Sequence, residues 1–162
     1  MLIEKYGLQI HPEGGWYKQT YQSDAFIPQD CLPAGFTGAR PFATAIYFLL
    51  EHGNFSAFHR IKSDECWHFY AGQALEIFIL TADGSLTINR LGSDFENNEQ
   101  FQFVVPANCW FASRPAAASE FCFVGCTVSP GFDFEEFELG TASELSATYP
   151  AHAEIIQQLS RQ

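Results

Sequence analysis

His59 and Glu65 are the residues of this chain whose types and spacing best suit acid–base chemistry. They lie in two strand-like segments, 54–62 and 65–71, that are joined by a short turn. A carboxylate near an imidazole raises the basicity of the ring and fixes its tautomer, as a general base requires. The alternative is a structural histidine, hydrogen-bonded within a β-core. We expect the pair to be functional.

Strand parity predicts which side chains share a face with this pair, because successive side chains of a strand point to opposite faces. Ile61 lies on the same face as the histidine. Trp67 and Phe69 lie on the same face as Glu65, whereas His68 points the other way. The pattern predicts a pocket with an imidazole, a carboxylate and an aromatic lining, and a structural or interface role for His68.

The elements that must position these side chains are mostly strands. Short helices are expected over residues 1–7 and after a cap at Ser143, and a further helical segment is expected over 151–161. Residues 23–40 contain turn-forming residues and are expected to form a loop that covers a site. Asp83–Gly84 predicts a hairpin. Nine strand-like segments are separated by turn signals, at 15–22, 42–50, 54–62, 65–71, 75–80, 86–91, 100–105, 110–113 and 121–128.

Length and composition agree with one β-rich domain over residues 1–162. The chain has 47% hydrophobic and 17% charged residues, which is typical of a globular protein. It contains 17 Phe, and aromatic side chains suit the half-buried surface of a sheet. Many short strands at regular spacing predict an all-β sandwich or barrel.

Charge and cysteine content exclude several classes of function. The formal net charge is −11, and no basic cluster offsets it, so neither nucleic acid nor an anionic membrane surface is an expected partner. The five cysteines include no Cys-x-x-Cys pair, which argues against a zinc ribbon or a thioredoxin-type site. The N-terminal residues show no basic segment followed by an apolar stretch, so we expect no signal peptide and a cytoplasmic protein.

Two segments resemble the paired motifs of the cupin superfamily. Gly53, His59, Glu65 and Gly72 have the spacing of the first cupin motif, but Ile61 stands where the motif has its second histidine. The second motif is represented by residues 106–111, with the two departures described next. The resemblance implies that His59 and Glu65 face the interior of a jelly-roll barrel.

In the second motif, Asn108 replaces a glycine and Phe111 replaces the histidine. Asparagine tolerates the left-handed backbone that a glycine position demands, whereas phenylalanine cannot coordinate a metal. Metal-binding cupins use the two histidines and the glutamate of the first motif plus the histidine of the second. Only His59 and Glu65 remain here, so no cofactor is expected. A divalent metal held by these two with another donor such as His11 is the weaker alternative.

Over nearly its whole length the chain resembles one cupin branch, the cupin-5 proteins of unknown function. The resemblance rests on the segments His11–Tyr17, Ala43–Leu50, Phe58–Gly72, Val105–Trp110 and Thr127–Phe134. It implies a cupin double-stranded β-helix, that is, a jelly-roll barrel with short terminal helices. It also implies a homodimer and a similarity in fold to the dTDP-deoxysugar epimerases. The branch has no agreed reaction.

The same resemblance adds five candidate site residues. His11 and Glu13 lie in a Gly-rich stretch that could approach a ligand, or that simply forms a turn. Tyr47 could donate a proton or pack in the barrel. Arg40 could clamp an anionic ligand or form a surface ion pair. Asp133 could line the mouth of the pocket or face solvent.

Three functions stay open on these grounds, and the sequence leaves open whether the protein is an enzyme. The first is a metal-independent isomerase or epimerase acting on a small polar or sugar-like molecule, with His59 as base, Glu65 as its orienting group and Tyr47 as proton donor. The second is a binding module in which Trp67 and Phe111, together with Phe69, stack on a metabolite. The third is a metal-dependent oxygenase or hydrolase.

Overall fold

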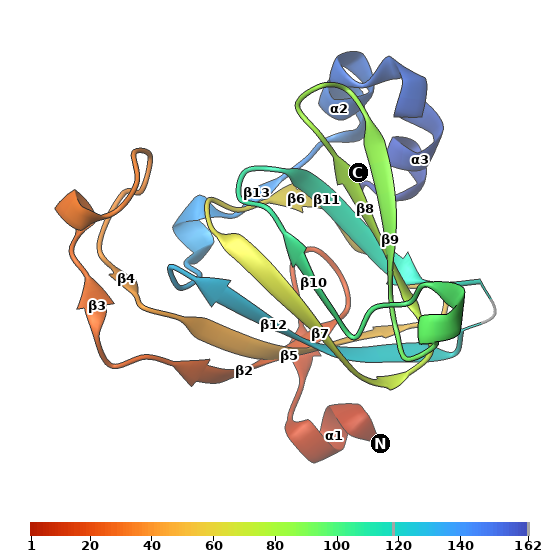
Figure 1. Cartoon of the computed structure of the whole chain (residues 1–162), viewed down its shortest axis with the longest axis horizontal. Helices are drawn as coiled ribbons and strands as arrows, with labels where there is room; N and C mark the ends of the chain where they lie inside the picture. The colour runs from red at the N-terminus through yellow and green to blue at the C-terminus, as the bar shows by residue number, and fades with distance from the viewer. Residues whose placement is uncertain (118, 162) are drawn as a thin grey trace.

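The computed structural model describes residues 1–117 and 119–161, and most of its regular structure is β. Two antiparallel sheets face each other as a jelly-roll β-sandwich, as Figure 1 shows. The expected all-β cupin fold is confirmed. Hydrogen bonding does not join the two large sheets into one closed cylinder in the described part of the chain, so the barrel is an open one.

The larger sheet has six strands in the order β1-β2-β5-β12-β7-β10. Its strands run antiparallel to their neighbours, and β12 pairs along most of its length with both β5 and β7. The bounds are β1 Gln9–Ile10, β2 Trp16–Gln22, β5 Thr44–Glu51, β12 Phe121–Ser129, β7 Asp64–Gly72 and β10 Gln102–Val105.

The second sheet has five strands in the order β13-β6-β11-β8-β9. The β8–β9 hairpin turns at Asp83–Gly84, as the sequence predicts. The bounds are β13 Glu138–Leu139, β6 Ser56–Arg60, β11 Trp110–Pro115, β8 Leu75–Leu80 and β9 Leu86–Leu91. All nine expected strands are confirmed, with ends that differ by no more than two residues.

Residues 23–40 form an arm that extends from the sandwich (Figure 1). The arm contains β3 Phe26–Ile27 and the 3-10 helix η1 Gln29–Cys31, and it ends where β4 Arg40–Pro41 pairs with β3. Two further 3-10 helices, η2 Phe95–Asn97 and η3 Phe134–Glu136, lie in connecting segments.

Short helices pack on the outer faces of the sheets. Helix α1 Leu2–Tyr6 ends at Gly7, as expected, and contributes to an apolar cluster on the outer face of the larger sheet. Helices α2 Ala142–Thr148 and α3 Ala153–Gln158, with the 3-10 helix η4 Pro150–His152 between them, cover the outer face of the second sheet. The cap of α2 is Thr141, whose hydroxyl accepts a hydrogen bond from the Glu144 amide, so the expectation of a cap at Ser143 is wrong.

The interior between the sheets is apolar and aromatic. Phe48, Trp67, Phe111 and Ile77 are fully buried there, each less than 2% exposed. Cys122 and Cys126 lie in the same core as small buried side chains. Burial of this apolar surface is the main favourable term for folding. A polar group in such an interior costs free energy unless it has a hydrogen-bond partner.

Residue 108 confirms the interpretation of the second motif. Asn108 has a φ of 63°, in the left-handed region where glycine is otherwise preferred. The tight turn brings β11 back beside β6 so that Phe111 lies directly opposite His59 in the antiparallel register. The position that carries a ligand in metal-binding cupins is therefore held in place here, but by a phenyl ring.

Among the described residues, no helix combines the length and the apolar character that a bilayer crossing requires.

We predict that Gly14→Ala lowers the free energy of unfolding by at least about 2 kcal/mol more than Gly53→Ala. Both glycines have positive φ, 113° and 79°, so both substitutions strain the backbone. A Cβ at Gly14 would overlap the Phe55 carbonyl oxygen, whereas a Cβ at Gly53 has open space. Urea denaturation of both variants measures the difference. Equal losses would contradict the close packing of the turn that carries Glu13.

Candidate active site

A cavity of about 300 Å³ lies between the two sheets. Strands of both sheets and the segment that follows β12 contribute to its lining, and none of the arm residues 23–40 does. The arm therefore does not cover the cavity directly, contrary to expectation. The lining side chains are Gln9, His11, Glu13, Tyr17, Gln19, Thr44, Ile46, Phe48, His59, Ile61, Glu65, Cys126, Val128, Phe132, Phe134 and Phe137.

The polar centre of the cavity is the carboxyl group of Glu13. Its Oε1 accepts a hydrogen bond of 2.8 Å from the Ser56 hydroxyl. Its Oε2 lies 3.2 Å from Nε2 of His59 and 3.4 Å from Nδ1 of His11. One carboxyl group thus connects two imidazoles that are far apart in the sequence.

The turn between β1 and β2 places Glu13 in this position. The backbone amides of Gly14 and His11 close the turn through hydrogen bonds with the His11 and Gly15 carbonyls. The Glu13 carbonyl accepts hydrogen bonds from the Ala57 amide and from Nε of Arg161, each 2.9 Å long. The turn is therefore fixed to β6 and to the C-terminal region. The stretch His11–Gly15 does not only start strand β2, because it also places the Glu13 side chain in the cavity.

The contacts of His59 define where its proton lies. Nδ1 is 2.7 Å from the Ala57 carbonyl, and a carbonyl only accepts, so Nδ1 carries the hydrogen. Nε2 of the neutral ring then has a lone pair, and it faces Glu13 Oε2. Two acceptors at 3.2 Å require one proton between them, either on the carboxyl group or on the imidazole. Glu13 and His59 therefore form a pair that holds one exchangeable proton.

His11 supports the protonated form of Glu13. Its Nδ1 accepts a hydrogen bond of 3.3 Å from the Glu13 amide, so this nitrogen has a lone pair that also faces the carboxyl group. Burial raises the pKa of Glu13, and the His11 charge, the Ser56 hydrogen bond and Arg161 only partly oppose this rise. Burial likewise lowers the pKa of His59 and of His11. With the proton on Glu13 Oε2, the neutral pair satisfies the contact with His59 Nε2, and Oε1 still accepts from Ser56.

Glu65 is a further titratable group that lines the cavity, at the start of β7. Burial raises its pKa to about 7, the His59 charge opposes the rise and the Glu13 charge adds to it. A carboxyl group with a pKa near neutrality exists in both forms under ordinary conditions, as a general acid or base requires. The expectation that Glu65 orients His59 is not what the hydrogen bonds show, because that contact belongs to Glu13.

Three phenylalanines that follow β12 cover the histidines, and we call Phe132, Phe134 and Phe137 the aromatic wall. The Phe134 ring stacks on His11 at a centroid distance of 5.8 Å, and Phe137 lies 5.4 Å from the His59 ring. Apolar rings on this side exclude water from the imidazoles and offer a stacking surface to a ligand.

Strand parity explains where several predicted residues lie. Trp67 and Phe69 are on the inner side of β7, in or against the core cluster that adjoins the cavity, and neither lines it. Phe111 is also in this cluster, with its ring 4.1 Å from the His59 ring. His68 points the other way, as expected, and bonds Thr127 and Gln102.

Tyr47, Arg40 and Asp133 lie outside the cavity. Tyr47 is on the outer face of β5, where its ring packs against Tyr6 and Phe123, because the inner face of this strand carries its even-numbered residues. Arg40 is buried in an ion pair with Glu136 and is not available to a ligand. Asp133 caps η3 through the Glu135 amide. None of the three is brought to His59.

The donor set does not fit the metal centre of metal-binding cupins. Ile61 and Phe111 occupy two of its ligand positions. Both nitrogens of His59 face other protein groups, Nδ1 the Ala57 carbonyl and Nε2 the Glu13 carboxyl group. Among the residues that the structure describes, no three His, Cys, Asp or Glu side chains are grouped so that they could hold one ion.

Several lining residues could not be predicted from the sequence pattern. The aromatic wall lies in a segment without strand periodicity, so only the tertiary structure brings it to the histidines. Cys126, which lines the cavity, and Ser56, which donates to Glu13, are similar cases, because a short polar or thiol side chain in an apolar run is usually structural. Parity along β5 would have favoured Ile46 and Phe48 over Tyr47.

Comparison with known proteins shows similarity over most of the chain to the three proteins that follow. A protein from Shewanella oneidensis is 42% identical, with a TM-score of 0.88 over 99% of this chain and 95% of that one. A hypothetical protein from Leishmania major is 30% identical, with a TM-score of 0.89 over 99% and 97% of the two chains. An uncharacterised Saccharomyces cerevisiae protein is 29% identical over 83% of this chain and 71% of its own length.

More distant similarity extends to oxalate decarboxylase from Bacillus subtilis. The TM-score is 0.56 at 14% identity, over 93% of this chain and 36% of the decarboxylase, so the likeness concerns the fold alone. The model of the family described as Cupin superfamily (DUF985) matches residues 1–140. The chain therefore belongs to this family of the cupin superfamily.

Proposed function

We propose that this cupin catalyses a proton-transfer isomerisation of a small, uncharged hydroxy-carbonyl compound without a metal. The observation that carries the proposal is that two proton-holding groups, Glu65 and the Glu13–His59 pair, line one cavity. Burial raises the pKa of both carboxyl groups, and the pKa of Glu65, about 7, lies in the range that a general base uses near neutral pH.

The reaction follows from these two groups. Ionised Glu65 takes the proton from the carbon next to the carbonyl, and the carbonyl oxygen takes the proton of the Glu13–His59 pair, which gives an enediol. Glu65 then returns its proton to the former carbonyl carbon, while the second hydroxyl group returns a proton to the pair. Both groups are restored, and the carbonyl has moved by one carbon.

This assignment changes the roles expected from the sequence. The hydrogen bond to Nε2 comes from Glu13, so Glu65 is free to act as the base and His59 acts within the proton-donating pair. Tyr47 has no part, because its ring lies on the outer face of the sheet.

The charge of the lining supports an uncharged ligand. The described lining residues include two glutamates and no lysine or arginine, and Arg40 is paired elsewhere. An anionic group in the cavity would lie near buried carboxyl groups without a cation to compensate it. This disfavours phosphorylated or nucleotide-linked sugars and favours free hydroxy-carbonyl compounds, whose hydroxyl groups donate to carboxylates and whose apolar faces stack on aromatic rings.

A binding module without chemistry is the second candidate. The aromatic wall and the inner-facing Tyr17 and Phe48 support it, because ligand pockets are mostly apolar with a few placed polar groups. A ligand that raises the melting temperature but exchanges no proton with solvent would favour this candidate.

Proton exchange with heavy water tests the isomerase directly. We expect the protein to catalyse deuterium incorporation from D₂O next to the carbonyl of a small aldose or ketose, followed by NMR. Glu65→Gln and Glu13→Gln should each reduce the rate by at least about 100-fold, and His59→Ala should reduce it similarly, because each removes a proton carrier. Tyr47→Phe is the matched control and should keep the parent rate. Full exchange in His59→Ala with an intact fold would reject the mechanism.

The raised pKa of Glu65 predicts a stability that depends on pH. The folded pKa of about 7 exceeds the unfolded value, so the native state binds more protons than the unfolded chain between about pH 4.5 and 7. This group therefore lowers stability as the pH rises through that window. Glu65→Gln should gain about 1–3 kcal/mol relative to the parent between pH 5 and pH 8.

Urea denaturation at several pH values measures this gain. Glu120→Gln is the control, because Glu120 is exposed and its removal should leave the pH slope unchanged. A Glu65→Gln variant with the parent pH slope would show that the carboxyl group ionises normally in the folded protein.

Elemental analysis tests metal independence. Protein purified without tags, chelators or added metal should contain far less than about one equivalent of metal per chain, and dialysis against EDTA should not change its melting temperature. About one equivalent of iron, manganese, nickel or zinc, lost together with stability on dialysis, would instead support the metal-dependent oxygenase or hydrolase.

A further inference from the structure

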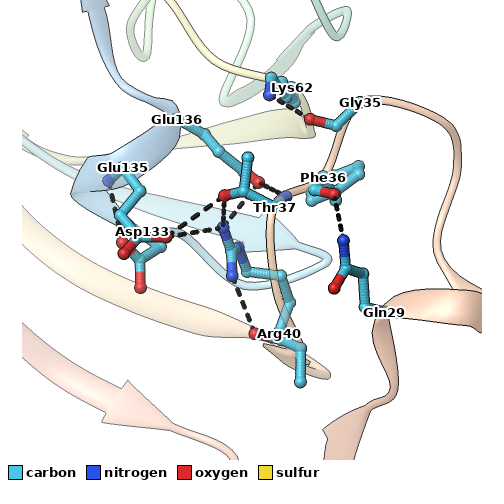
Figure 2. Close-up of polar contacts among 10 residues, drawn as sticks. Gln29, Gly35, Phe36, Thr37, Arg40, Lys62, Asp133, Glu135 and Glu136 are labelled. Carbon is cyan, nitrogen blue, oxygen red and sulfur yellow. Dashed lines mark hydrogen bonds and ion pairs between the residues drawn. The ribbon is translucent and has the colours of Figure 1, made fainter.

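Arg40 and Glu136 form a buried ion pair between the arm and the segment that carries the aromatic wall. Nη2 of Arg40 lies 2.6 Å from Oε1 of Glu136, and the two side chains are only 3% and 5% exposed. Figure 2 shows Arg40 directed at Glu136, with Thr37 beside them. The backbone amide of Thr37 also donates to Glu136 Oε1, and the Thr37 hydroxyl group donates to the Glu135 carboxylate.

The segment 131–140 is fixed at both ends. At one end the Gly131 amide donates to Pro41 and the Phe132 amide donates to Thr44. At the other end β13 pairs with β6. The middle, residues 133–137, is a single short turn around η3. Among the described residues, the hydrogen bonds that join residues 133–137 to the rest of the protein are all made with Thr37 and Arg40.

The ion pair therefore lies where the wall is otherwise weakly held. Phe134 and Phe137 flank Glu136 in the sequence, and their rings contact His11 and His59 from this turn. Phe134 is still 48% exposed, so ring packing alone does not bury the wall. Local segments with few buried contacts open most readily, and a buried tie in the middle opposes that opening.

Further hydrogen bonds hold the part of the arm that carries Arg40. The Gln29 side chain donates to the Phe36 carbonyl, and the Lys62 ammonium group donates to the Gly35 carbonyl (Figure 2). Arg40 also donates to the Ala39 carbonyl and lies over the Phe36 ring. A fixed guanidinium group is what a positioning role requires, because a mobile one could not hold its partner in place.

We propose that Arg40 is a positioning residue that acts through Glu136 to hold the aromatic wall against His11 and His59, and so controls access to the cavity. A buried ion pair rarely adds net stability over an apolar replacement, so its value lies in the geometry that it fixes. Without the guanidinium group, the Glu136 carboxylate would be buried without a counter-charge and would move outward to water, taking Phe134 and Phe137 with it.

Access can be measured without a substrate, by carbethoxylation of histidines with diethyl pyrocarbonate. Mass spectrometry follows His11 and His59, with the exposed His52 as internal reference. Modification of Cys122 by methyl methanethiosulfonate reports global opening, because Cys122 is buried in the core and does not line the cavity. This readout is independent of the proposed isomerase activity.

In Arg40→Met we expect His11 and His59 to react at least about tenfold faster than in the parent, with Cys122 still protected. Arg40→Lys keeps the charge and should restore most of the protection. Arg60→Met is the matched control: it removes the 2.7 Å ion pair with Glu138 on the same segment, which is exposed, and it should leave both rates unchanged.

Glu136→Gln covers the case in which Arg40→Met does not fold. The amide keeps the shape and still accepts from Thr37, so a smaller acceleration at the two histidines is expected with Cys122 protected. Parent rates in folded Arg40→Met, or equal acceleration in Arg60→Met, would overturn the proposal. Acceleration shared by Cys122 in both Arg40→Met and Glu136→Gln would also overturn it, because the pair would then hold the whole fold rather than the wall.

Discussion

The burial of the Glu13 carboxyl group between two imidazoles is the interaction on which the cavity depends. A carboxylate cannot be buried there without a proton or a cation, and no lysine or arginine is present among the described lining residues. The arrangement is stable only while a proton is shared, which ties the turn after β1 to β6 and aligns His59. The exchangeable proton on which the proposed isomerisation depends follows from this requirement.

The fold was predictable because it is encoded in local patterns. Alternation of apolar side chains and turn residues gave the strands to within two residues, and the cupin spacing of His59 and Glu65 placed both at the cavity. Asn108 was recognised correctly as a left-handed position. These features need only the neighbours along the chain. The homodimer and the cytoplasmic location do not follow from such patterns and stay predictions.

The contacts of the site were not predictable, because they connect distant residues. The partner of His59 is Glu13, which reaches it through a turn whose position depends on packing against β6. Arg40 looked available for a ligand, but its partner Glu136 is 96 residues away and adjoins the aromatic wall. Parity could decide which face a side chain occupies, but it could not decide which charged groups meet.

The turn at Asn108 has a consequence for how this fold changes its chemistry. The backbone that delivers a ligand to the centre in metal-binding cupins is intact, with Phe111 directly opposite His59, and Ile61 lies in the cavity on the same strand face. Two side chains, rather than any rearrangement of strands, therefore separate the coordination sphere of metal-binding cupins from the cavity of this protein. The same strands can therefore carry either set of side chains. Few substitutions are needed to pass from a metal-binding site to a site without metal ligands.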